Sequence, residues 1–346
     1  MSALTLEKLF TSPMGSDVDT ATAVQLAACR ILDGAPLGVL ADDPDVLAAL
    51  GGALPALAGA PPRLLLLLAG IRCGKSMLIA DKAIHLARTC YMGPPIRPSD
   101  DIRVPIVSVE VDNAKATFQH VVRTIQNSPE LSALLDGEPK ADSVRILHES
   151  STPENKRSVE IKVVALSRAG STLMSRWFPG VIFDEAPLMG GSIEYVKNLD
   201  EALTAIHGRV LPGGTIMLVG SAEGRTGPVY DLFKKHFGAS GPDAVVILGT
   251  GPKMNPVYYT PERCAELKRV DERAFRKNVL CEFVDPEEQP IDERTIEAAT
   301  RAEPGDVAPI KGHDYTAAMD PATRKNAWTF GIIGSSAERR YYVALS

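Results

Sequence analysis

The chain begins with helical spacing of apolar positions and continues with short apolar runs. Residues 21–32 and 44–50 place apolar side chains three and four apart, which predicts two helices. Glycine and proline interrupt the pattern between residues 51 and 62. We therefore expect a helical N-terminal segment and linker at residues 1–60.

The next part of the chain alternates between strand-like and helix-like patterns. Five consecutive leucines at residues 64–68 predict a strand buried on both faces of a parallel sheet. A short loop follows, and helical spacing covers residues 77–88. Further strands are expected at 104–111, 144–148, 159–166, 180–183, 215–220 and 244–248, and helices at 114–125, 194–207, 229–237 and 261–280. Alternation of this kind predicts an α/β fold with a mostly parallel sheet.

The C-terminal part has a different pattern. Residues 315–320, 328–334 and 340–345 predict three consecutive strands after a polar connector. We therefore expect four segments: the N-terminal segment at 1–60, a main domain at 61–284, a connector at 285–314 and the start of a second domain at 315–346.

Composition fits a soluble globular protein. Of the 346 residues, 45% are hydrophobic and 23% are charged. No apolar run is long enough to span a bilayer, no signal peptide is visible, and the five cysteines show no paired metal spacing. A formal net charge of −6 disfavours a protein that grips DNA over its whole surface. Any contact with nucleic acid is expected to be local.

The loop after the leucines has the sequence Gly70-Ile-Arg-Cys-Gly-Lys-Ser76. Strand, glycine loop, Lys-Ser and helix, in this order, are typical of a phosphate-binding loop. Backbone N–H groups would cradle the phosphates, Lys75 would reach the β/γ-phosphates, and the Ser76 hydroxyl would hold Mg²⁺. The usual spacing has glycine at position 69, which is alanine here, so an ordinary strand–turn–helix is the alternative. The candidate phosphate-binding residues are Gly70, Arg72, Cys73, Gly74, Lys75 and Ser76.

A second apolar strand ends in two carboxylates, Asp184 and Glu185. Ligands of open α/β folds bind at the carboxyl ends of the strands. Asp184 would complete the Mg²⁺ shell opposite Ser76, and Glu185 would deprotonate the water that attacks the γ-phosphate. A base that activates water favours hydrolysis over phosphoryl transfer to another substrate. Ser221, after the next strand, would contact the γ-phosphate or its water. Acidic and small polar residues at strand-end turns are the alternative.

Three arginines are candidates for stabilising the charge that develops during phosphoryl transfer. Arg72 lies in the loop and would act in cis. Arg168 and Arg176 precede the Asp-Glu strand and would act in cis or reach into a neighbouring subunit. For these two, a surface salt bridge is the alternative.

These elements, in this order, resemble the large terminase subunit of tailed bacteriophages, the motor that packages DNA into procapsids. The resemblance rests on the basic residue before Gly-Lys-Ser, the strand ending in Asp-Glu, and a Gly-Ser-Ala coupling motif. The coupling motif corresponds to Gly220, Ser221 and Ala222. Gln25 resembles the adenine-reading glutamine of the family. Met254-Asn255-Pro256 and residues 281–285 are similar to stretches that close its ATPase domain.

The segment from Tyr315 to Asp320 resembles the first strand of the family's RNase H-like nuclease, whose aspartate binds a catalytic metal. The resemblance implies a P-loop (RecA/ASCE-like) ATPase with a helical N-terminal segment, followed by the first strands of an RNase H-like domain. A two-metal nuclease needs several converging carboxylates, and after Asp320 the sequence offers only Glu338. We therefore expect a truncated nuclease domain without cleavage activity.

By this resemblance, the chain is expected to be an ATP-hydrolysing motor subunit that translocates double-stranded viral DNA into a procapsid. Its cofactors would be ATP and Mg²⁺, with Mg²⁺ or Mn²⁺ for a complete nuclease domain. Its partners would be DNA, the portal protein, the small terminase subunit and further copies in a ring, a pentamer, on the portal. No membrane is involved, and the expected location is the cytoplasm of the infected bacterial host.

Two other function classes share part of the pattern. A helicase-like or remodelling DNA-dependent ATPase would carry the same glutamine, Lys-Ser, Asp-Glu and Ser-Ala motifs. It needs a second RecA-like domain with its own arginine motif, for which the remaining length is too short. A non-hydrolysing nucleotide-binding scaffold would have no need of Glu185.

Overall fold

The computed structural model describes residues 4–57, 59–94, 96–97, 99–109, 111–166, 173, 176–189, 199–239, 241–284, 311–320, 329–335 and 341–345. The chain forms two compact units, Met1–Asp285 and Pro286–Ser346. The expected N-terminal segment and main domain both lie in the first unit. Most of the expected connector at 285–314, together with Arg168 and Glu338, lies outside the described residues.

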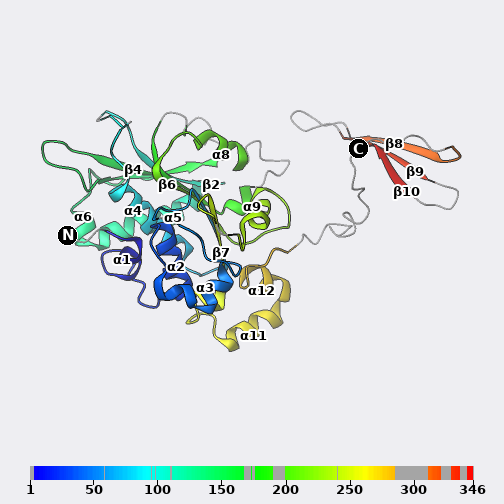
Figure 1. Ribbon diagram of the computed structural model, residues 1–346, viewed down its shortest axis with the longest axis horizontal. Helices are drawn as coiled ribbons and strands as arrows, with labels where there is room; N and C mark the ends of the chain where they lie inside the picture. Colours follow the sequence, from blue (N-terminus) through cyan, green and yellow to red (C-terminus); the bar gives the residue numbers. More distant parts are fainter. Residues whose placement is uncertain are drawn as a thin grey trace. The chain divides into compact units, whose positions relative to one another are not determined.

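The first unit is built on a seven-stranded sheet of order β3-β4-β2-β5-β6-β1-β7 (Figure 1). Its strands are β1 Leu64–Ala69, β2 Arg103–Ser108, β3 Ser143–Leu147, β4 Ser158–Ala165, β5 Phe178–Asp184, β6 Val210–Gly220 and β7 Ala244–Gly249. All neighbouring strands are parallel except β3 and β4, which are antiparallel. The predicted α/β fold with a mostly parallel sheet is therefore confirmed.

The leucine run occupies a central strand, as its lack of alternation predicts. Strand β1 pairs in parallel with β6 on one side and β7 on the other, and Leu65 to Leu68 are fully buried. Strand β5 lies on the other side of β6. The carboxyl ends of β5, β6 and β1 therefore meet at one edge of the sheet.

The helices of the first unit mostly follow the expected pattern. They are α1 Leu6–Thr11, α2 Ala23–Leu32, η1 Gly38–Asp42, α3 Pro44–Ala49, α4 Lys75–Thr89, α5 Val111–Asn127, α6 Pro129–Ser132, η2 Ala186–Met189, α8 Leu199–Ile206, α9 Pro228–His236, α10 Gly251–Met254, α11 Pro261–Val270 and α12 Glu272–Asn278. The single helix expected at 261–280 is wrong. Asp271 is extended and caps α12, since its side chain accepts the Ala274 N–H at 2.8 Å.

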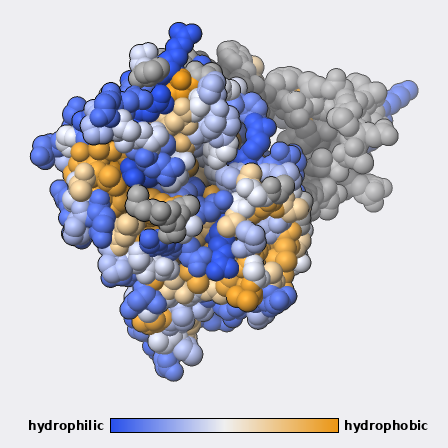
Figure 2. Space-filling view, turned by 60° about the vertical axis from the view of Figure 1, so that its left-hand side comes forward, coloured by the Kyte–Doolittle hydropathy of each residue, from blue (hydrophilic) through white to orange (hydrophobic). Residues whose placement is uncertain are grey.

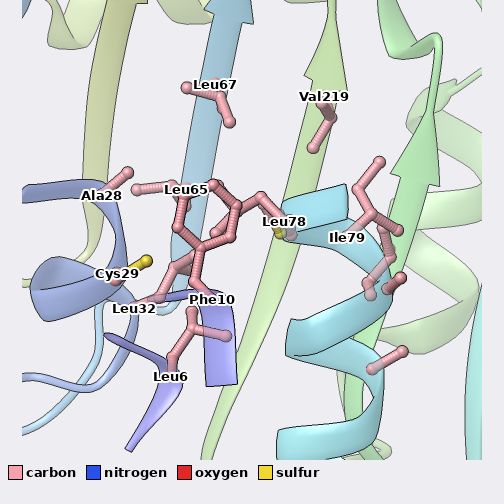
Figure 3. Packing of buried hydrophobic residues seen from close by; sticks show 14 of the residues in the cluster. Leu6, Phe10, Ala28, Cys29, Leu32, Leu65, Leu67, Leu78, Ile79 and Val219 are labelled. Atoms are coloured by element: carbon pink, nitrogen blue, oxygen red, sulfur yellow. The ribbon is translucent and has the colours of Figure 1, made fainter. Parts of the chain in front are cut away.

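The N-terminal helices are part of the main core. Figure 3 shows Phe10 of α1 and Leu32 of α2 packed near Leu65 of β1 and Leu78 of α4. All four are almost fully buried, and burial of one such side chain contributes roughly 1.5–3 kcal/mol. This packing holds the N-terminal segment against the helix that follows the phosphate loop.

The second unit contains a three-stranded antiparallel sheet of order β10-β9-β8, formed by β8 Asp314–Asp320, β9 Thr329–Ser335 and β10 Tyr341–Leu345. The three strands expected at the C-terminal end are present. Asp320 ends β8. That this sheet begins an RNase H-like domain stays a prediction.

On the face in Figure 2, hydrophilic and hydrophobic residues are interspersed. Among the described helices, none combines the length and the apolar character needed to cross a bilayer.

A buried carboxylate lies on α4 beneath the N-terminal segment. Asp81 is fully buried, and burial raises the pKa of its carboxyl to about 7, against the opposing effect of the Ser16 hydroxyl and N–H. Because the folded-state pKa lies above the unfolded-state value, the folded protein binds the extra proton. The contribution of this group to the free energy of unfolding is fully present below the unfolded-state pKa. It is lost as the pH rises through about 7.

We therefore expect Asp81→Asn to stabilise the protein at pH 8 by an amount on the order of a few kcal/mol. The difference from wild type should shrink steadily toward pH 4, as both forms become neutral at this position. Chemical denaturation at several pH values measures the effect, with the exposed Asp231→Asn as control. A difference that is independent of pH would contradict the assignment.

Candidate functional site

Three adjacent strands bring the candidate residues to one edge of the sheet. Leu68 of β1 pairs with Gly220 of β6, and Val219 of β6 pairs with Asp184 of β5, so the three carboxyl ends are level. A cavity of about 590 Å³ opens there. It is lined by Phe10, Asp17, Val18, Asp19, Thr20, Gln25, Ile71, Arg72, Cys73, Gly74, Lys75, Ser76, Met77, His120, Glu185, Ser221, Met254 and Asn255.

The loop between β1 and α4 needs both of its glycines. Gly74 has φ +80° and precedes the first residue of α4, Lys75. A Cβ on Gly70 would lie 2.8 Å from the Val279 carbonyl oxygen and 2.9 Å from that of Asn278. The loop therefore passes close to the segment after α12. This close approach explains a glycine at position 70.

Lys75 spans the ends of two strands. Its Nζ donates to the carbonyl oxygens of Ala69 at 2.8 Å and Gly70 at 2.9 Å, and to the Ser221 hydroxyl at 3.0 Å. The Ser221 hydroxyl itself donates to Ala69 at 2.9 Å. The ammonium group, the loop and the end of β6 are thus joined in one network. Ser76, the second residue of α4, lies beside this network in the cavity wall.

Asp184 is held from the neighbouring helix α5. The carboxylate is buried and accepts a hydrogen bond from the hydroxyl of Thr117. Burial raises the pKa of Asp184, while Thr117 and the charge of Lys75 oppose this effect. A buried carboxylate with so few donors is a favourable ligand for a cation.

Glu185 adopts a strained conformation at the end of β5. Its φ is +56°, a left-handed value that is uncommon for residues other than glycine. Burial raises its pKa; Lys75 and the Ser221 N–H oppose this, and the carboxylates of Asp184 and Glu223 reinforce it. A raised pKa suits a general base.

The coupling motif packs closely against this turn. A Cβ on Gly220 would lie 2.4 Å from Pro187 and 3.4 Å from the Cα of Glu185, so only glycine fits between β6 and the Asp-Glu turn. Ala222 is buried, and its N–H donates to the Cys281 thiol at 3.3 Å. The motif therefore contacts both the cavity and the segment that leaves the first unit.

Gln25 reaches the phosphate loop from α2. Its Nε2 donates to the Cys73 carbonyl at 3.1 Å, and its Oε1 accepts the Thr22 N–H at 2.9 Å in a capping box. Gln25 is buried and lines the cavity. Cys73 is buried as well, and this raises the pKa of its thiol to about 12, so it stays protonated.

The two candidate arginines that the structure describes, Arg72 and Arg176, lie in different places. Arg72 is exposed at the rim of the cavity with φ +60°. Arg176 precedes β5, at the opposite edge of the sheet from Asp184, and pairs with Asp101 at 2.8 Å. Seven residues of strand put roughly 20 Å between the two ends of β5. Arg176 therefore lies far from Asp184 within the chain, and its role as the charge-stabilising arginine stays a prediction. Arg168 lies outside the described residues.

The donors at this edge fit a magnesium ion bound together with a nucleotide. Mg²⁺ is held through one or two carboxylates plus substrate phosphates, and seldom by a cage made only of protein. Asp184 and the Ser76 hydroxyl supply this kind of set. Among the described residues, no group of three or more His, Cys, Asp or Glu side chains is placed to hold a metal ion, either at this edge or elsewhere.

Some residues of the site carried no recognised signal. Thr117 and His120 lie on one face of α5, at i and i+3. Thr117 contacts Asp184, and His120 lines the cavity, with its pKa lowered by burial and by Arg123. Phe10 comes from α1, a helix that the hydrophobic pattern did not reveal. An isolated threonine, histidine or phenylalanine gives no indication of a site.

Comparison with known proteins relates the fold to large terminases of bacteriophages. No family model matches the chain, and no curated protein matches it. Among solved structures, the HK97 bacteriophage large terminase aligns with a TM-score of 0.52 and 18% identity, over 82% of this chain and 58% of its own. A mutant ATPase domain of the Thermus phage P74-26 large terminase aligns at 0.49 and 16%, over 70% and 99%. The large terminase from a thermophilic bacteriophage, in complex with ADP, aligns at 0.46 and 13%, over 93% and 68%.

The likeness to the HK97 protein shows the fold. This chain shares the α/β fold of that large terminase, with a mostly parallel seven-stranded sheet in its first unit. The chain spans little more than half the length of the HK97 protein.

Proposed function

We propose that this chain is an ATP-hydrolysing motor subunit of the large-terminase type, which translocates double-stranded viral DNA into a procapsid. One observation carries the proposal. Lys75 at the start of α4, Glu185 after β5 and Ser221 after β6 line one cavity beside a phosphate-type loop. That arrangement supplies a phosphate-binding cation, a base for water and a polar group between them.

Each side chain would have a distinct task in hydrolysis. The Lys75 ammonium would bind the β/γ-phosphates, and the N–H groups at the start of α4 would bind their oxygens. Asp184 and Ser76 would hold Mg²⁺, which neutralises charge on the phosphates. Glu185 would take a proton from the attacking water.

The adenine ring and the charge-stabilising arginine also have proposed contacts. Phe10, Val18 and Met254 contribute apolar side chains to the cavity lining, on which an adenine ring would pack. Gln25, which also lines the cavity, would read the adenine edge. Arg72 would stabilise the charge of the transition state in cis, and Arg168 or Arg176 would do so in a neighbouring subunit.

The proposed partners follow from the same function. They are double-stranded DNA, the portal protein, the small terminase subunit and further copies of this chain in a ring, a pentamer, in the cytoplasm of an infected bacterium. The net charge of −6 disfavours DNA binding over the whole surface, so the proposed DNA contact would be local. The β8–β10 sheet would belong to an RNase H-like domain, with Asp320 as its first metal ligand.

Steady-state ATP hydrolysis tests the proposal. We expect slow basal turnover by the isolated chain, little changed by double-stranded DNA alone, and a severalfold increase when procapsids and DNA are both present. Stimulation by single-stranded DNA without procapsids would favour the helicase-like alternative. Nucleotide binding without turnover under all conditions would favour a non-hydrolysing scaffold.

A further inference from the structure

The outer side of the phosphate loop is bonded to the segment from α10 to α12. The Ile71 N–H donates to the Asn278 carbonyl at 2.7 Å. The Tyr259 hydroxyl donates to the Ile71 carbonyl at 2.7 Å, and Asn255 Nδ2 donates to the Arg72 carbonyl at 2.7 Å. Three consecutive peptide units of the loop are therefore each fixed from outside it.

These bonds determine which way the loop's N–H groups point. In a trans peptide, the C=O and N–H groups point in opposite directions. Because the Ile71 and Arg72 carbonyls face Tyr259 and Asn255, the N–H groups of Arg72 and Cys73 face away from these side chains. Neither N–H has an acceptor among the described residues. Successive free N–H groups of this kind form an anion-binding nest.

The loop needs this external support. Arg72 has φ +60°, which is unfavourable for a residue with a Cβ. Such a conformation persists only where surrounding contacts hold it. Asn255 and Tyr259 bind the carbonyls on both sides of this residue.

The two donors are themselves well placed. Asn255 Oδ1 accepts the Tyr258 N–H at 3.2 Å, which turns Nδ2 toward Arg72. Tyr259 is buried, and burial raises the pKa of its hydroxyl to about 12, so the hydroxyl stays protonated and donates. Its ring also packs edge-on against Tyr258, with centroids 4.9 Å apart.

We propose that Asn255 and Tyr259 are positioning residues that hold the phosphate loop with its N–H groups directed at the phosphates of a nucleotide. This inference rests on the proposed nucleotide site and adds two residues to it. Their effect is on phosphate groups and is independent of the base, because the bonds they make are to the loop backbone.

Three variants test this role by calorimetric binding of inorganic pyrophosphate, ATP and adenosine. Tyr259→Phe removes only the hydroxyl, and Asn255→Leu removes the amide at similar size. We expect each to weaken pyrophosphate and ATP binding about three- to tenfold, the effect of one lost hydrogen bond. Adenosine binding should be unchanged. Tyr258→Phe, which removes an exposed hydroxyl one residue away, is the matched control and should bind all three ligands as wild type does.

Three outcomes would overturn the proposal. Wild-type affinity for pyrophosphate and ATP in both variants would show that the two side chains do not position the loop, while wild-type ATP binding would leave the proposed function intact. An equal loss for adenosine and pyrophosphate would show general damage to the cavity. If the wild-type chain bound neither ATP nor pyrophosphate, the proposed function and this inference would both fail.

Discussion

Replacing Glu185 with glutamine should leave ATP bound and stop its hydrolysis. The substitution keeps the size of the side chain and its place in the cavity but removes the group that would accept a proton from water. General-base catalysis typically contributes about 10²–10⁴ to the rate, so we expect kcat to fall at least 100-fold. The dissociation constant for ATP should stay within a few-fold of wild type, since the assigned phosphate contacts come from Lys75 and the loop.

Single-turnover hydrolysis and equilibrium ATP binding, measured on the same preparation, test this prediction. Glu266→Gln is the control, because Glu266 is exposed on α11, pairs with Arg263 at 3.0 Å and does not line the cavity. That control should retain hydrolysis within a few-fold of wild type. Turnover by Glu185→Gln at the wild-type rate would remove Glu185 as the base.

Local sequence signals were sufficient to locate this edge of the sheet. The leucine run has no polar alternation, so its central position in the sheet follows from composition alone. Asp184 and Glu185 directly follow an apolar strand, and parallel strands end at a common edge. Lys75 comes after β1 and Ser221 comes after β6. The two side chains contact each other because β1 and β6 are neighbouring strands.

Tertiary contacts account for what the sequence did not predict. Strand β6 begins at Val210, although Pro212-Gly213-Gly214 has the composition of a turn. The sheet accommodates this three-residue segment through a shift in the pairing of β5 with β6 and a φ of +74° at Gly213. Pairing with β5 outweighs the local preference.

The contacts around the phosphate loop were also beyond local signals. Asn255 and Tyr259 bond to the loop across more than 180 residues of sequence. No spacing rule connects positions so far apart. Arg176 shows that closeness in sequence can also mislead. It precedes Asp184 by only a few residues, but an extended strand separates the two in space. Closeness in sequence did not bring it to the site.

Lys75→Ala should have the largest effect on nucleotide binding. The side chain is the proposed phosphate-binding cation, and its Nζ already lies among oxygen atoms at the ends of β1 and β6. Loss of one hydrogen-bond donor to developing negative charge typically costs about 10²–10³ in rate. We expect ATP turnover to fall by at least this factor and ATP affinity to fall with it, whereas Glu185→Gln should lose turnover alone.

The comparison of the two variants separates binding from chemistry. Lys253→Ala is the control for Lys75→Ala, since Lys253 is exposed on α10 and pairs with Asp45 at 2.7 Å; it should keep wild-type turnover. Lys75→Arg should not restore activity, because a planar guanidinium cannot take the place of a compact ammonium among three converging oxygens. ATP binding and turnover by a folded Lys75→Ala protein, both at wild-type levels, would mean that the Gly-Lys-Ser loop is not the nucleotide site, whatever its likeness to one.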